Sequence, residues 1–162
     1  MATQNIIQYL ETSQYNALPA GGTVPVGVEA MNRRQIETFI ASEAIAVREA
    51  VAFDITKAGN GDKMIHVVKA DSNDVEHTAF VGVALGAAEI GETVDVCIAG
   101  LCEAKTDGSV TKGSALSVFT TAGELKNYAN SDVLPPVAYA CEDDGTAPLP
   151  ADVATIIVIK QF

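Results

Sequence analysis

A succession of short β-branched segments, each followed by a turn, is the feature that most restricts the fold of this chain. Such segments recur from about residue 36 to the end, and Gly, Asp and Pro separate them. Residues of this kind favour strands, and no run of about 15 residues with helical periodicity lies between them. We therefore predict an all-β fold, a small β-barrel or a β-tulip or sandwich core. The first expected β segment, residues 36–55, alternates at Ile45, Val47, Val51 and Phe53. The strands expected after it are 63–70, 80–85, 93–99, 114–119, 136–141 and 154–160.

Two glycines in this pattern predict local departures from regular pairing. Gly82 lies inside an expected strand, where a missing side chain permits a bend or a close approach of two backbones. Gly100 follows a run in which Val94 faces one side and Asp95 the other. The apolar alternation then changes phase toward Leu101, which predicts a bulge that lets one long strand curve around a barrel.

Local pattern also suggests finer features between the strands. Residues 80–98 are echoed by residues 136–159, each a Val-rich strand, an acidic or glycine turn and a second strand. Two related β units in one barrel account for this similarity, and so does chance among β-rich segments. Residues 57–63 read as a β-hairpin or a longer turn, and residues 120–130 have room for one helical turn.

The first forty residues differ from the rest. Pro19 and Pro25 stand among three glycines in residues 18–27. Proline removes a backbone donor and glycine raises the entropy cost of ordering, so this stretch suits an extended arm better than a core. An apolar spacing in residues 6–10 fits a short amphipathic helix that would not be stable alone. We therefore divide the chain into an N-terminal arm, residues 1–40, and a β-barrel-like core, residues 41–162.

The charge balance argues against several classes of partner. The net charge is −11, from 21 acidic and 10 basic residues, and Arg33 with Arg34 is the local basic pair. A polyanion would be repelled, so we expect no nucleic-acid partner. Apolar runs stay well below the roughly 20 residues of a membrane span, so we expect no membrane partner. The N-terminus also lacks the pattern of a secretion signal, which favours synthesis and retention in the cytoplasm.

Side chains capable of chemistry are present but form no recognisable constellation. Cys97, Cys102 and Cys141 lack the spacing of a disulfide framework or a zinc site, and they read as buried free thiols. His66 fits a strand position and His77 a loop. No Gly-x-Ser-x-Gly nucleophile motif occurs.

The polar loops read as solvated turns. Residues 57–63 and 107–114 contain Gly and Lys but not the order of a phosphate-binding loop. Residues 71–77 lack the ligand positions of an EF-hand, and residues 142–144 form a second acidic loop. We therefore predict no catalytic residue, no cofactor-binding residue and no metal ligand, and expect a protein that is not an enzyme.

Five segments share a pattern of strands and turns without a catalytic signature: 49–55, 80–100, 107–118, 136–143 and 154–160. Through these segments, residues 40–160 resemble the phage head decoration proteins, also called cement or capsid-stabilising proteins. Residues 1–40 fall outside the resemblance.

This resemblance implies a role rather than a reaction. Such proteins bind the outer surface of an icosahedral head between capsomers and stabilise the shell against internal genome pressure. It implies the major capsid protein as partner, a homotrimer, no cofactor, and a place on the outer capsid surface of a virion after synthesis in the host bacterial cytoplasm.

Two alternatives from other classes remain. A virion-surface carbohydrate- or receptor-binding module would stack sugars on aromatic side chains, but the chain has no Trp and 4 Tyr. An enzyme on a small barrel would need a nucleophile and a base, and no such pair is evident in the sequence.

Overall fold

The computed structural model describes residues 34–130, 132 and 134–160, apart from the side chain of Val75. Contacts divide the chain into residues 1–33 and residues 34–162. The predicted arm therefore lies mostly outside the described residues. The last part of the predicted arm, residues 35–40, is described. It belongs to β1 (Gln35–Ala41), the first strand of the barrel, and not to an arm.

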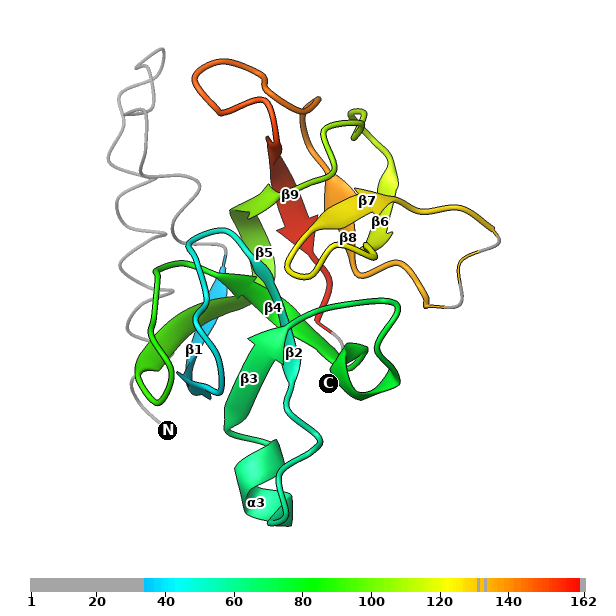
Figure 1. Ribbon diagram of the computed structural model, residues 1–162. Helices are drawn as coiled ribbons and strands as arrows, with labels where there is room; N and C mark the ends of the chain where they lie inside the picture. The colour runs from blue at the N-terminus through cyan, green and yellow to red at the C-terminus, as the bar shows by residue number, and fades with distance from the viewer. Residues whose placement is uncertain (1–33, 131, 133, 161–162) are drawn as a thin grey trace, which may run out of the picture. The chain divides into compact units, whose positions relative to one another are not determined.

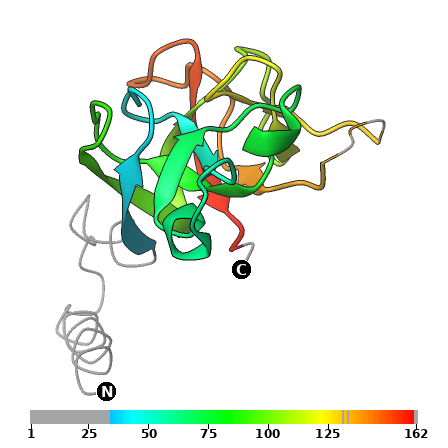
Figure 2. The same cartoon turned by 60° about the horizontal axis from the view of Figure 1, so that its bottom comes forward.

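Five strands form a closed barrel, and the predicted all-β class is confirmed (Figures 1 and 2). Their order is β1-β3-β2-β4-β5, and β5 pairs back with β1 to close the ring. β1 and β3 are parallel, whereas the other neighbours are antiparallel. After β1, the strands are β2 (Ala50–Phe53), β3 (His66–Lys69), β4 (Phe80–Ala84) and β5 (Thr93–Lys105).

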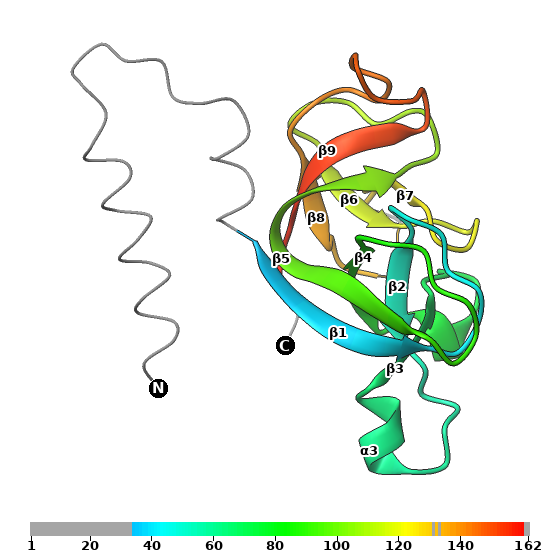
Figure 3. The same ribbon diagram turned by 90° about the vertical axis from the view of Figure 1, so that its left-hand side faces the viewer.

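A second sheet begins at the C-terminal half of β5. Gly100 to Lys105 pair with β9, and the order continues through β8 and β6 to β7. Figure 3 shows β5 beside β1 in its first half and beside β9 in its second. A parallel bridge between Thr106 and Leu125 brings β7 back to the end of β5. These strands are β6 (Ala115–Val118), β7 (Leu125–Asn127), β8 (Ala138–Ala140) and β9 (Val153–Val158).

The expected irregularity at Gly100 is present. Gly100 has a φ of 97°, which favours glycine, and the β1–β5 register shifts immediately before it. The phase change is real, because Val94 packs inside the barrel whereas Cys102 packs in the second cluster. The predicted residue is wrong, however: Leu101 is only half-buried, and the buried positions are Cys102 and Ala104.

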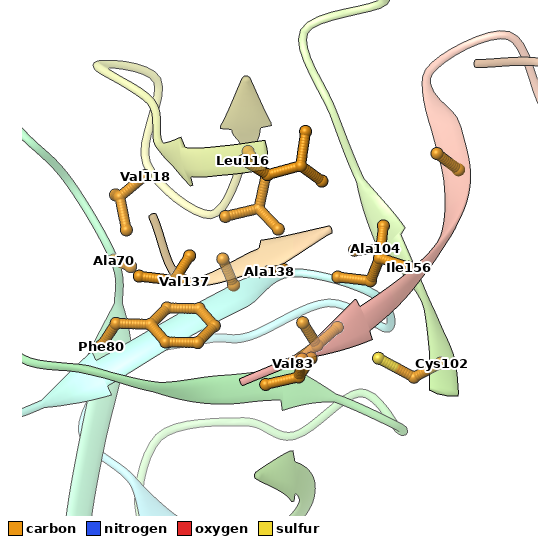
Figure 4. Close-up of a cluster of buried hydrophobic side chains, with 14 of the residues drawn as sticks. Ala70, Phe80, Val83, Cys102, Ala104, Leu116, Val118, Val137, Ala138 and Ile156 are labelled. Atoms are coloured by element: carbon orange, nitrogen blue, oxygen red, sulfur yellow. The ribbon is translucent and has the colours of Figure 1, made fainter. Parts of the chain in front are cut away.

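Two hydrophobic clusters hold the sheets together. The barrel cluster fills the ring of strands and is built from Val, Ile, Ala and Phe side chains such as Phe39 and Ile98. The second cluster lies between the second sheet and the outer side of β2 and β4 (Figure 4). Phe80 on β4 and Leu116 on β6 both belong to it. β4 and β5 contribute side chains to both clusters.

Gly82 is explained by the approach of β4 to β5. A Cβ atom at Gly82 would lie 2.2 Å from the carbonyl oxygen of Cys97 and 2.8 Å from a methyl group of Val96. The sequence predicted such a close backbone approach. The β2–β4 register also shifts beside it, between Val51 and Ala52.

Two local predictions are wrong. Residues 120–130 contain β7 instead of a helical turn, because Leu125 is fully buried and pairs with Val118 across the sheet. Residues 57–63 are not only a turn, since they end in the short helix α3 (Asn60–Lys63). A 3-10 turn, η1 (Val75–His77), precedes β4.

The two echoing segments each form an antiparallel pair, but the predicted placement of both in one barrel is wrong, because β8 and β9 belong to the second sheet. Residues 80–98 supply the antiparallel pair β4–β5, and residues 136–159 supply the antiparallel pair β8–β9. The pairs adjoin because β5 also binds β9. Within the described residues, no helix is long and apolar enough to cross a membrane.

Candidate interaction surface

The two histidines make local contacts. His66 begins β3, and its Nδ1 lies 2.8 Å from the carbonyl oxygen of Asp62 in the preceding helix. His77 ends η1, and its Nδ1 lies 3.3 Å from a carboxylate oxygen of Asp74. The two rings therefore belong to separate turns, each with a partner close in sequence.

Two of the three thiols meet in the core. Cys97 and Cys102 are buried in the second cluster, and Cys141 is half-buried. A hydrogen bond from Cys102 lowers the pKa of Cys97, against the opposing effect of burial, and Arg34 lowers it further. The same hydrogen bond, together with burial, raises the pKa of Cys102 well above its usual value. Burial also raises the pKa of Cys141.

The acidic loops use their carboxylates to fix turns. Asp71 accepts a hydrogen bond from the Asn73 amide at 2.8 Å, and Asp143 accepts one from the Lys112 amide at 2.7 Å. Asp144 accepts from the Thr106 hydroxyl and the Val110 amide, which ties the β8–β9 loop to the β5–β6 loop. In the described part of the chain, no group of three or more His, Cys, Asp or Glu side chains is placed to hold a metal ion.

One apolar feature of the described surface is a row across the second sheet. Leu101 on β5 lies opposite Ile157 on β9, and Ile157 lies opposite Tyr139 on β8. Directly opposed residues share one face of a sheet. Ile157 is 45% exposed and Tyr139 48% exposed, and both point away from the second cluster. We call Leu101, Ile157 and Tyr139 the apolar row.

A second exposed apolar group surrounds α3. Ile55 follows β2, whereas Met64 and Ile65 precede β3, and all three are exposed. They lie in the segment that extends from one end of the barrel (Figure 1). Four residues of α3 contribute no buried side chain, so this segment adds surface rather than core.

β1 carries an edge that the barrel does not fully use. The Ala41 amide donates to Glu92 at 2.8 Å on the β5 side, and the Ile40 amide donates to Ile65 at 2.8 Å on the β3 side. Backbone groups alternate in direction along a strand, so the amides of Ile36 and Thr38 point to the same side as that of Ile40. Within the described residues, β3 pairs with β1 only at Ile40 and Ala41.

A comparison with solved structures finds a similar fold in a phage protein. The head fiber gp8.5 N base in bacteriophage phi29 superposes with a TM-score of 0.54 at 14% sequence identity, over 78% of this chain and 95% of that chain. The chain has the fold of that head-fiber base. No family model matches the sequence, and no curated protein matches it.

Within this head-fiber base fold, the apolar row and the β1 edge are the features that sequence reasoning missed. Ile157 stands in an almost continuous apolar run, 153–159, where outward and inward positions look alike. The exposure of Ile157 becomes evident only when β9 is seen to pair with both β5 and β8, because that pairing sets which face of β9 points outward. The β1 edge was missed because residues 35–40 were assigned to the arm.

Proposed function

We propose that this chain is a structural protein of a phage head that binds the outer surface of the icosahedral shell between capsomers. It acts as a trimer, contacts the major capsid protein, and stabilises the shell against the pressure of the packaged genome. The observation that carries this proposal is the fold shared with the phi29 head-fiber base, which covers nearly the whole of that chain.

The described surface suits such a role. The apolar row offers side chains from three adjacent strands, and covering them would remove apolar area from water at roughly 25 cal/mol per Å². The net charge of −11 disfavours contact with the packaged nucleic acid and fits an outward location.

The test is binding to purified capsids of the phage that encodes the chain. Cryo-electron microscopy of the decorated particles should show density on the outer surface, and co-sedimentation should measure affinity. Tyr139→Ser combined with Ile157→Ser should weaken binding at least tenfold, which corresponds to about 1.4 kcal/mol. Ile90→Ser, at a 73% exposed loop position between β4 and β5, is the matched control and should bind like the parent.

Two results would contradict the proposal. One is an absence of added density on capsids saturated with the protein. The other is binding to a glycan array without binding to capsids, which would favour the receptor-binding alternative. Heating the particles and recording when DNA escapes tests stabilisation separately from attachment.

A further inference from the structure

We propose that the free edge of β1 is a strand-acceptor site and that residues 22–28 of a neighbouring copy occupy it. Addition of a strand to an exposed sheet edge is a common mode of protein recognition, in which main-chain hydrogen bonds supply affinity. The inference rests on the proposed function in one respect, because it requires copies that stand side by side.

The acceptor consists of two backbone positions in register. The amides and carbonyls of Ile36 and Thr38 point to the side that β3 occupies further along the strand. On the opposite side, residues 35–40 pair with β5 in the closed barrel, so the edge is held rigid. Among the described residues no strand covers this edge before Ile40. Such edges are covered or blocked in most proteins.

The surroundings of the edge offer apolar contacts and disfavour an acidic occupant. Ile36 is 43% exposed on the strand itself, and the exposed Ile65 lies where β3 would continue. Glu37 and Asp95 place negative charge nearby, with Asp95 bonded to the Thr38 hydroxyl at 2.6 Å. A second β1 does not fit, because pairing that uses both Ile36 and Thr38 would set Glu37 opposite Glu37, and like charges in that position are destabilising.

Residues 22–28 have the required sequence. No charged residue occurs from Thr12 to Val28, and Val24, Val26 and Val28 alternate as in a strand. Pro25 stands between them and has no amide hydrogen. In an added strand the three valines turn their backbone groups toward β1, and Pro25 faces away. The outer edge of the new strand then lacks one donor, at Pro25, which disfavours the addition of a further strand.

The connection limits the distance to the neighbour. Six residues, 29–34, join Val28 to β1, and fully extended they span about 20 Å. The accepting barrel must therefore lie beside the donating one, as in a closed ring of three copies that each give and receive a strand. The same connection is long enough for residues 22–28 to fold back on their own β1, which is the competing arrangement.

Paired proline substitutions test the acceptor in the full-length chain. Thr38→Pro removes an amide hydrogen on the free edge and the hydrogen bond from the Thr38 hydroxyl to Asp95. We expect only a small fall in melting temperature, together with loss of the trimer in analytical ultracentrifugation. Glu37→Pro removes an amide directed at β5 and should lower the melting temperature more. In the arm, Val26→Pro should abolish the trimer, and Gly27→Pro should not. Hydrogen exchange should show that the Ile36 and Thr38 amides are protected in the parent and lose this protection in Val26→Pro.

Cross-linking separates the two arrangements. In a Cys141→Ser background, chains with Thr38→Cys are mixed with chains carrying a cysteine at position 24, 26 or 28 and oxidised with glutathione disulfide. Exchange between copies gives a disulfide-linked dimer in the mixture, and Thr111→Cys, on a distant loop, serves as the control that gives none. If a chain with both cysteines closes only on itself at high dilution, the occupant belongs to the same copy and the proposal is overturned. It is equally overturned if neither product forms.

These outcomes are independent of capsid attachment. A Thr38→Pro variant that remains trimeric while the parent binds capsids refutes the strand acceptor and leaves the proposed function intact. If the parent chain does not bind capsids but the cysteine variants form the mixed disulfide, the proposed function is refuted and the strand acceptor is supported.

Discussion

Gly82 has the least freedom of any glycine whose surroundings the structure describes. Because a methyl group there would overlap the Cys97 carbonyl at 2.2 Å, β4 or β5 would have to move. Gly82→Ala should lower the free energy of unfolding by about 3 kcal/mol, measured by urea denaturation. Gly86→Ala is the matched control: no atom lies within 4 Å of its added methyl group, and the change should stay within about 0.5 kcal/mol. Equal losses would mean that the strands do not approach as described.

Asp54 is a buried carboxylate that makes stability depend on pH. Burial alone would raise the pKa of Asp54, but hydrogen bonds from the Thr56 hydroxyl and amide, together with the nearby Lys57, lower it to about 2. The Thr56 hydroxyl donates to it at 2.6 Å, and Lys57 lies 3.5 Å away. Its folded-state pKa lies below the usual value of 3.8, so its contribution is present above about pH 4 and is lost as the pH falls toward 2.

Asp54→Asn should remove this dependence. Between pH 5 and pH 2, the free energy of unfolding of the parent should fall by about 2 kcal/mol more than that of the variant. Chemical denaturation at several pH values measures the difference. Asp152→Asn, at an exposed loop carboxylate, should follow the parent curve. Parallel curves for the parent and Asp54→Asn would show that the carboxylate is not stabilised as described.

At the scale of elements, β5 tests the register of the barrel. Val94 is buried in the barrel cluster, whereas Asp95 is exposed and bonds the Thr38 hydroxyl. Val94→Asp places a charge among apolar side chains and should cost about 4 kcal/mol. Asp95→Ala removes a surface contact and should cost about 0.5 kcal/mol or less. Thermal unfolding of both variants measures the contrast, and similar shifts would show that the strand faces the other way.

Elements with strict alternation were predictable from sequence, and elements fixed by distant partners were not. Thr93 to Ile98 alternate apolar and polar residues closely enough to reveal both strand and face. β7 has three residues, and its strand character depends on the pairing of Leu125 with Val118. The entry of β1 into the barrel likewise depends on β5, which lies more than fifty residues away.

At the scale of the whole described unit, composition predicted the class but not the surface. The Val-rich, Trp-free sequence predicted a small all-β core, and the structure divides that core into two clusters. Chain order gave no indication that β5 would join β9 or that Leu101, Ile157 and Tyr139 would meet in one row. Exposure of a residue in an apolar run depends on which strands cover it, and only the folded chain contains that information.

The sharing of β5 has a mechanical consequence. One continuous strand belongs to the barrel through Thr93 to Ala99 and to the second sheet through Gly100 to Lys105. A pull that separates the two sheets therefore acts along the strand, and the hydrogen bonds on both sides bear the load together in shear. A strand at a free edge would instead peel away one bond at a time. The barrel and the second sheet should therefore unfold together, at a force higher than the force that separates two domains joined only by a loop.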